Sequence, residues 1–325
     1  MKNNSKLQIT NFSHAGTSKL RMMLLILTFS LGHLAFSISS YAANGTGTTG
    51  AQFLRLGAGA RPVAMGGAYT AISDDVNGPQ YNAAGIAWAK HKEAIASYID
   101  YLEGITYGYI GYIQPLQNGS ALGMALAYLN SGSIDQTDLA GTSIGTFSST
   151  QSLLLLTYAK TMGPKMSWGT NLKMFQQKIE NEKANGYAFD FGAIYKLWPR
   201  LAFGLNVQNL GPGVKFVQEK DPLPLTIKAG VAYIFVEDML TLSTDAKYQP
   251  KEDSKINENV GLEYWVNQNL ALRVGYDTAN ISDIENFNGI TAGLGFQVAG
   301  FNLHYAWMPY GILGDTHRIS VGYKW

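Results

Sequence analysis

The sequence predicts an all-β fold, a 14-stranded antiparallel transmembrane β-barrel. Three features of the chain support this prediction. An export signal occupies the N-terminus, segments of about ten residues alternate apolar with small or polar side chains, and short connections alternate with long ones. A strand that faces lipid on one side and a lumen on the other requires such alternation, so the three features describe one architecture.

Composition excludes several classes of protein. Of the 325 residues, 46% are hydrophobic and 14% are charged, which excludes a disordered chain. The mean hydropathy of −0.04 hides the alternation, because a strand with only one apolar face averages near zero. The chain contains no cysteine and therefore has no disulfide, thiolate metal site or cysteine nucleophile. A formal charge of +1 offers no electrostatic footprint for nucleic acid.

The first 42 residues have the layout of a secretory signal peptide. An apolar run from Met22 to Phe36 is followed by small residues, and Ser40 and Ala42 suit the −3 and −1 positions of cleavage after Ala42. Cleavage after Ala43 is the alternative. An uncleaved anchor helix would need about 20 apolar residues, and this run is shorter. The basic residues that precede the run are Lys2, Lys6, Lys19 and Arg21.

From about residue 91 onward the chain alternates with a period of two, which predicts half-exposed strands. The predicted strands run from Lys92 to Leu102, Ile105 to Pro115, Ser120 to Gly132, Thr146 to Met162, Met166 to Glu180, Gly186 to Trp198, Leu201 to Leu210, Leu225 to Phe235, Met239 to Gln249, Asn259 to Val266, Leu270 to Thr278, Asn288 to Val298, Phe301 to Met308 and Thr316 to Trp325.

The connections between these strands are of two kinds. Every second connection is a tight turn: 117–119, 163–165, 199–200, 237–238, 267–269 and 299–300. The intervening connections are mostly longer and polar, including 133–145, 211–224, 250–258 and 279–287. Short turns on one rim and long loops on the other are typical of an outer-membrane barrel. A soluble β-sandwich also contains many short strands, but it has no reason to place its long loops at one end.

Charge identifies the face of the strands that lines the lumen. On a lipid face Arg273 would cost about 2–4 kcal/mol near the midplane, so Arg273 and Asp277 face inward and Leu272 and Val274 face lipid. A three-residue turn places Glu263 of the preceding strand opposite Arg273, which predicts an interior ion pair.

The last strand alternates up to the chain terminus. Its apolar face includes Tyr323 and Trp325, and we expect it to pair with the first strand to close the barrel. A terminal aromatic residue resembles the signal by which the barrel-assembly machinery recognises its substrates.

Residues 43 to about 90 are rich in glycine and alanine and lack alternation, so they are not barrel wall. Fourteen strands should leave a lumen, since about eight are filled by their own side chains, and a plug would fit there. Arg55 and Arg61 could pair with Asp74 or Asp75. These charges would anchor the segment or contact a ligand or partner; the sequence leaves both interpretations open.

This segment also carries a family resemblance. Residues 50–61 read GAQFLRLGAGAR, residues 65–71 read MGGAYTA, and residues 81–87 read YNAAGIA. They resemble the opening of the PorV/PorQ family, a branch of the FadL-like outer-membrane barrels, although Ala83 and Ile86 replace the proline and leucine of the family's Asn-Pro-Ala-Gly-Leu motif. The resemblance implies a hatch formed by residues 43–90 inside a barrel formed by residues 91–325. The hatch-motif residues are Phe53, Arg55, Gly57, Arg61, Gly66, Gly67, Asp74, Asp75, Asn82 and Gly85.

The sequence favours neither catalysis nor a cofactor. His304 is the one histidine placed mid-strand on the lumen face, and Ser320 on the next strand is the one serine near it, but no acidic residue is placed to orient the pair. Candidate metal ligands are scattered without the spacing of a site. We therefore expect a non-enzymatic protein without cofactor or metal.

Two functions remain. The leading hypothesis, implied by the FadL resemblance, is passive transport of hydrophobic small molecules across the bacterial outer membrane. The alternative, implied by the PorV-like opening, is a component of type IX protein secretion that binds cargo or partner proteins. In either case the expected partners include outer-membrane lipid and the barrel-assembly machinery of a Gram-negative cell, and exclude nucleic acid. A folded hatch disfavours a general aqueous porin.

Overall fold

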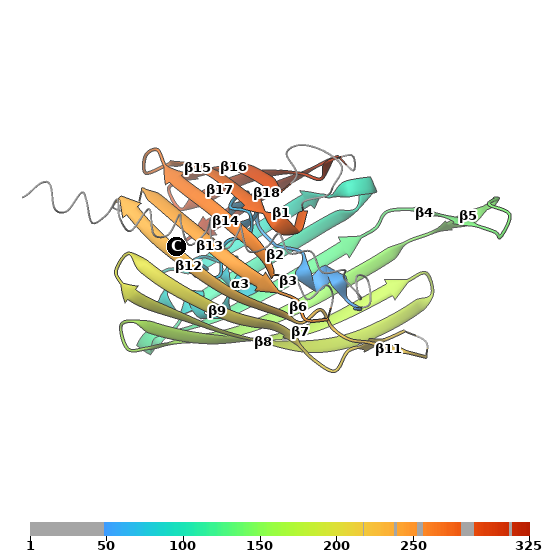
Figure 1. Cartoon of the computed structure of the whole chain (residues 1–325), viewed down its shortest axis with the longest axis horizontal. Coiled ribbons are helices and arrows are strands. Elements are labelled where there is room, and N and C mark those ends of the chain that lie inside the picture. Colours follow the sequence, from blue (N-terminus) through green and yellow to red (C-terminus); the bar gives the residue numbers. More distant parts are fainter. Residues whose placement is uncertain (1–48, 217, 237–238, 252–255, 281–288, 312–313) are drawn as a thin grey trace, which may run out of the picture. The chain divides into compact units, whose positions relative to one another are not determined.

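The computed structural model describes residues 49–216, 218–236, 239–251, 256–280, 289–311 and 314–325 (Figure 1). The predicted signal peptide, residues 1–42, lies outside the described residues, as does the predicted turn at Glu237 and Asp238. None of the helices in the described part of the chain is long and apolar enough to cross a membrane.

The strands form a closed antiparallel barrel, which confirms the predicted fold. Each strand pairs with its neighbours in the chain, and β1 pairs with both β2 and β18. The barrel strands are β1 (Glu93–Asp100), β2 (Thr106–Pro115), β3 (Ser120–Asn130), β6 (Ser149–Met162), β7 (Met166–Ile179), β8 (Glu182–Trp198), β9 (Leu201–Leu210), β12 (Thr226–Val236), β13 (Leu240–Tyr248), β14 (Ile256–Trp265), β15 (Leu270–Asp277), β16 (Ile290–Val298), β17 (Phe301–Pro309) and β18 (Asp315–Lys324).

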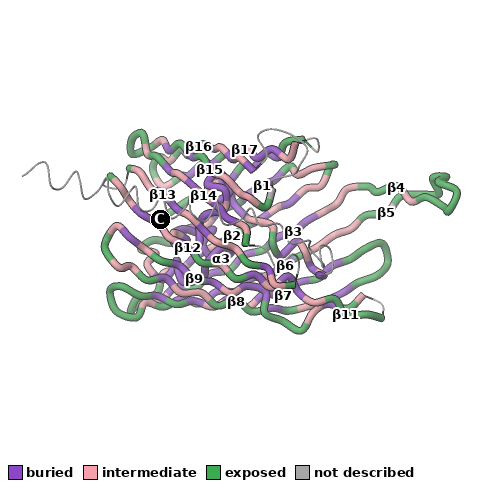
Figure 2. Tube along the Cα trace, in the orientation of Figure 1, coloured by how far each residue is buried: buried purple, intermediate pink, exposed green. Residues whose placement is uncertain are grey.

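Side chains alternate between the lumen and the outer face along each strand, as Figure 2 shows by the alternation of buried and exposed positions. On β15, Leu272 and Val274 are 42% and 47% exposed, whereas Arg273 between them is 4% exposed. The three-residue turn before β15 sets the register that pairs Glu263 with Arg273. The outer face is therefore apolar and the inner face carries the charges, as a membrane barrel requires.

One connection is shorter than its sequence indicates. We expected the strand after β7 to begin at Gly186, but β8 begins at Glu182 and Lys178 pairs with Lys183. Lys183 and Asn185 are exposed polar residues and Ala184 between them is buried, so the outward positions carry no apolar side chain from which the strand could be predicted. Main-chain pairing continues through these residues.

Two of the connections on the long-loop rim form small hairpins. The hairpin of β4 (Ile134–Thr137) and β5 (Ser143–Phe147) is the more prominent and projects away from the barrel wall in Figure 1. A second pairs β10 (Val214–Lys215) with β11 (Lys220–Asp221). Within the described residues after residue 90, the short helices are η3 (Leu102–Gly104), η4 (Gln117–Gly119) and η5 (Thr278–Asn280).

The described part of the N-terminal segment, residues 49–90, forms four short helices and is mostly buried. They are η1 (Gln52–Arg55), α2 (Ala60–Ala64), α3 (Gly78–Tyr81) and η2 (Ala83–Trp88). Helix α2 packs against β15 to β18, and η2 packs against β2, β3, β6, β7 and β8. The segment therefore contacts separate arcs of the inner wall.

Candidate functional site

Glycines on the inner wall allow the backbone of the N-terminal segment to approach closely. At Gly192 of β8 a Cβ would collide with the Asn82 side chain, and at Gly275 of β15 it would collide with the backbone of Met65 and Gly66. A side chain at either position would exclude the segment from its present place. Further wall glycines whose Cβ would meet the segment's backbone are Gly169, Gly204 and Gly261.

Buried polar side chains of the wall then hold the segment by its main chain. Asp245 of β13 accepts hydrogen bonds from the backbone N–H groups of Tyr69 and Thr70, both at 3.0 Å, and from Thr70 Oγ1 at 2.6 Å. Thr291 of β16 accepts from the Gly66 N–H at 3.0 Å and donates to the Ala64 carbonyl at 3.1 Å. The Asp245 bonds satisfy N–H groups that lie outside any helix or strand, whereas the Gly66 N–H is shared between Thr291 and the Val63 carbonyl, at 2.9 Å from the latter.

Other wall residues repeat this pattern around the barrel. Ser320 Oγ accepts from the Ala60 N–H at 2.9 Å, and Asn171 Nδ2 donates to the Pro79 carbonyl at 2.8 Å. Within the segment, the motif residue Asn82 caps η2 by accepting from the Ala84 N–H at 3.1 Å, and it donates to the Thr70 carbonyl at 2.9 Å. Asn82 thus ties two turns of the segment together.

An ion cluster joins the segment to β14 and β15. Arg61 reaches Asp74 at 2.7 Å, Asp75 at 3.0 Å and Glu263 at 2.9 Å. Arg273 Nε donates to the same Glu263 carboxylate at 2.6 Å. Burial acts to lower the pKa of Arg61, but the carboxylates, Asp74 foremost and then Glu263, outweigh it and hold that pKa well above its ordinary value. Arg61 therefore remains charged.

The other hatch-motif residues lie along the same segment. Phe53 packs edge-on against Phe175 of β7 with ring centres 6.0 Å apart. Gly66 and Gly67 have φ values of +63° and +77°, and a Cβ at Gly85 would meet the Ser73 carbonyl. Arg55 does not join the Asp74 and Asp75 cluster; it donates to Gln52 at 3.0 Å and Gln249 at 2.9 Å. At Gly57 the carbonyl accepts from Arg318.

The C-terminal residues Tyr323 and Trp325 lie apart from this segment. Their rings stack with centres 5.6 Å apart on the outer face, and both side chains are exposed. The main chain of Trp325 exchanges hydrogen bonds with Lys92 at the seam between β18 and β1. This end of the chain therefore completes the wall.

A cavity lies on each side of the N-terminal segment. The loop-side cavity, about 370 Å³, is lined at the rim of long connections by residues that include Arg55, Lys228, Lys247, Asp277 and Arg318. The turn-side cavity, about 410 Å³, opens toward the tight turns, and its lining includes Arg61, Glu263, Arg273, His304 and the turn residue Arg200. Residues of the segment line both.

Most of the wall residues at this site are not among the site residues predicted from the sequence. Asp245, Thr291, Lys228, Lys247 and Arg318 are all polar residues at inward positions, so the alternation that places Arg273 inward could have placed them too. Their partners in the segment are far away in the sequence, and spacing alone does not identify them. No group of three or more His, Asp or Glu in the described ranges could hold a metal ion.

A family model described as type IX secretion system protein PorV matches residues 39–247, which is more than half of the chain. The chain belongs to the PorV family. The family indicated by the motifs of residues 50–87 is thereby confirmed. No curated protein sequence matches the chain.

Solved structures with the same fold are FadL-like barrels. The toluene transporter TodX of Pseudomonas putida has a TM-score of 0.57 at 13% identity, over 82% of this chain and 96% of its own. The toluene transporter TbuX of Ralstonia pickettii has a TM-score of 0.57 at 12% identity, over 82% and 98%. A FadL homologue of Pseudomonas aeruginosa has a TM-score of 0.51 at 12% identity, over 87% and 99%. This PorV family member is an outer-membrane barrel.

Proposed function

We propose that this protein is an outer-membrane component of protein secretion that binds exported or partner proteins at its long-loop rim. The match to the PorV family model, described as a type IX secretion system protein, carries the proposal. The lumen agrees with it, because the N-terminal segment is bound by charged and polar groups on several strands. We propose that this segment, with boundaries near residues 43 and 90, is a hatch that closes the barrel.

The β4–β5 hairpin is the part of the rim best suited to contact a partner. Its apolar side chains Ile134, Leu139 and Ile144 are exposed, although they lie beyond the barrel strands. Exposed apolar residues gathered on one projecting hairpin are typical of a surface that contacts a partner. A partner protein would bury these side chains and leave the barrel unchanged.

Affinity capture from native outer membranes tests the secretion role. We expect exported proteins or secretion components to be recovered with the wild-type barrel, and recovery to fall when Leu139→Asp and Ile144→Asp are combined. Thr137→Asp combined with Thr142→Asp is the matched control, because it adds two charges to the same exposed hairpin without removing apolar surface. Recovery of the barrel alone, under conditions that preserve other complexes, would contradict the proposal.

A second candidate is passive transport of hydrophobic small molecules. The structures of TodX and TbuX are described as toluene transporters, and here cavities lie on both sides of the N-terminal segment. A molecule would pass if the segment moved. Flux of a fluorescent fatty acid into proteoliposomes, with and without residues 43–90, tests this candidate. Background flux in both preparations would exclude it.

We infer that the protein is not an enzyme. Ser320 Oγ accepts from the Ala60 N–H and lies 2.8 Å from Ser97 Oγ, so its hydroxyl serves packing of the segment. His304 Nδ1 lies 3.3 Å from Arg273, a cation rather than the acidic group that would orient a general base. We expect lipid and the barrel-assembly machinery as further partners, the latter through Tyr323 and Trp325.

A further inference from the structure

We propose that the loop-side cavity binds a compact organic carboxylate. Three basic residues of the wall, Lys228, Lys247 and Arg318, line the cavity, and Asp277 is the one acidic residue that the described part of the chain contributes to its lining. Asp277 already pairs with Lys247 at 3.9 Å. The lining therefore carries more positive than negative charge in a partly enclosed space, where an anion is stabilised more strongly than in bulk water.

Arg318 presents a donor without a partner. It extends inward from β18, is 4% exposed, and donates through one terminal nitrogen to the Gly57 carbonyl at 2.6 Å. Its Nε–H has no hydrogen-bond partner within the described part of the chain. A buried guanidinium with an unused N–H is suited to a carboxylate oxygen, since the planar fork and the carboxylate match in geometry.

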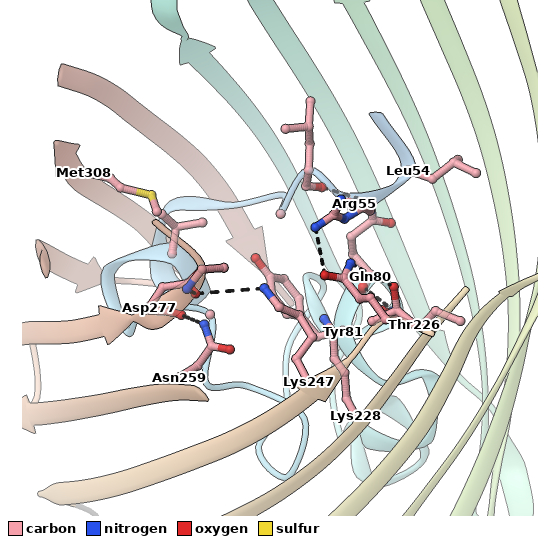
Figure 3. A pocket seen from close by; sticks show the side chains of 18 of the residues that line it. Leu54, Arg55, Gln80, Tyr81, Thr226, Lys228, Lys247, Asn259, Asp277 and Met308 are labelled. Atoms are coloured by element: carbon pink, nitrogen blue, oxygen red, sulfur yellow. Dashed lines mark hydrogen bonds and ion pairs between the residues drawn. The ribbon is translucent and has the colours of Figure 1, made fainter. Parts of the chain in front are cut away.

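Lys228 provides a further positive charge, whereas Lys247 is already paired with Asp277. Lys228 Nζ lies 5.4 Å from the centre of the Tyr81 ring, and no carboxylate of the described residues pairs with it. Figure 3 shows Lys228 and Lys247 beside Tyr81. Burial holds the pKa of Tyr81 well above its ordinary value, and its hydroxyl donates to the Ala58 carbonyl at 3.1 Å. Tyr81 therefore stays neutral and does not compensate the lysines.

The size and polarity of the cavity define the ligand class. About 370 Å³ is at the small end of the roughly 300–1,000 Å³ of small-molecule sites. The side-chain oxygen of Gln80, Oε1, lies on the lining, is buried and accepts no hydrogen bond from the described residues. It would accept a hydrogen bond from an N–H group of the ligand that lies near the ligand's carboxylate. A free organic acid and the C-terminal carboxylate of a polypeptide share this chemistry. The site does not depend on the proposed secretion role.

Calorimetric titration of the purified full-length chain in detergent at low salt tests the site. The probes are N-acetyl-alanyl-alanine, hexanoate, the amide of each, and inorganic phosphate. We expect at least one acid to bind at least tenfold more tightly than its amide, and the acid that binds identifies the source of the carboxylate. Equal binding of acids and amides, no binding of either acid, or tighter binding of phosphate than of both acids would overturn the proposal.

Paired variants separate the cavity from general surface charge. Lys228→Gln combined with Lys247→Gln should weaken binding of the acid at least tenfold, and Lys228→Arg with Lys247→Arg should retain it. Lys178→Gln with Lys183→Gln is the matched control, since both lysines are exposed on β7 and β8. Each variant is first shown to give a folded barrel by its heat-dependent gel mobility. If the folded variant with both Lys228→Gln and Lys247→Gln bound the acid as tightly as the wild-type protein does, the assignment of the site to this cavity would be overturned.

Discussion

The two cavities on either side of the N-terminal segment differ in how their charges are compensated. In the turn-side cavity Arg61 and Arg273 share Glu263, and Asp74 and Asp75 complete the contacts of Arg61. In the loop-side cavity Lys228 and Arg318 have no carboxylate partner among the described residues. Each charge of the turn-side cluster has a partner of opposite sign, although Arg273 Nη2 makes no hydrogen bond within the described residues. Such a cluster holds two parts of a protein together, whereas a charge without a partner of opposite sign attracts one from outside. We therefore assign anchoring to the turn side and binding to the loop side.

Removing Glu263 should have the largest effect on this comparison. Glu263→Gln leaves Arg61 and Arg273 as neighbouring buried cations, and loss of one partner from such a group costs about 3–5 kcal/mol. We expect faster hydrogen exchange at residues 58–75 and, if the segment leaves the lumen, higher conductance in planar bilayers. Glu180→Gln, in an exposed turn, is the control.

A second variant distinguishes charge from packing at the same place. Glu263→Gln combined with Arg273→Met removes both charges of the wall pair and should recover part of the lost protection, because one fewer cation remains uncompensated. If hydrogen exchange at residues 58–75 stays at the wild-type rate in Glu263→Gln, the ion cluster does not anchor the segment.

Filling the space at a wall glycine should have the next largest effect. Gly275→Val would place a side chain against Met65 and Gly66, and overpacking of this kind costs about 1–3 kcal/mol. We expect the barrel to assemble while residues near Met65 become accessible to protease. Gly108→Val on β2 is the matched control, because a Cβ there meets nothing within 4 Å. Equal protease resistance of the two variants would contradict close packing at Gly275.

The wall could be predicted from the sequence because its rules are local. Alternation places Arg273 inward, and a turn of three residues then sets Glu263 opposite it, so two neighbouring strands contain all the information needed. The rule fails at residues 182–185, where the outward side chains of Lys183 and Asn185 are polar. Main-chain hydrogen bonds extend β8 there without an apolar pattern in the outward side chains.

The site is less predictable because its contacts are not local. Arg61 could be linked to Asp74 and Asp75 since all three lie within one motif-bearing segment, but the third partner of Arg61 is 202 residues away. Lys228, Lys247 and Arg318 are unremarkable inward residues on three strands, and only the closed barrel brings them to one cavity. Long-range pairing of this kind requires the three-dimensional structure or covariation between positions.

The Asp245 contact should give a smaller effect than the ion cluster. Asp245→Asn keeps an acceptor for the N–H groups of Tyr69 and Thr70 but loses the charge, so we expect a cost of about 1 kcal/mol. The measurement is hydrogen exchange at the backbone amides of Tyr69 and Thr70. Asp138→Asn is the control, since Asp138 also accepts two backbone N–H groups, in the exposed β4–β5 hairpin. No change at Tyr69 and Thr70 would show that the carboxylate charge is not used.

The smallest effect is expected where the segment joins the wall. Lys196 Nζ lies 3.8 Å from the centre of the Trp88 ring, at the end of η2, and a cation over an aromatic ring contributes about 0.5–1 kcal/mol at a partly exposed position. Lys196→Met keeps the packing and removes the charge, so exchange at residues 83–90 should rise only a few-fold. Lys160→Met, on the outer side of β6, should change nothing there. If Lys196→Met exposed the segment as widely as Glu263→Gln, the segment would be held chiefly at its junction with β1, and the turn-side ion cluster would lose the anchoring role assigned to it.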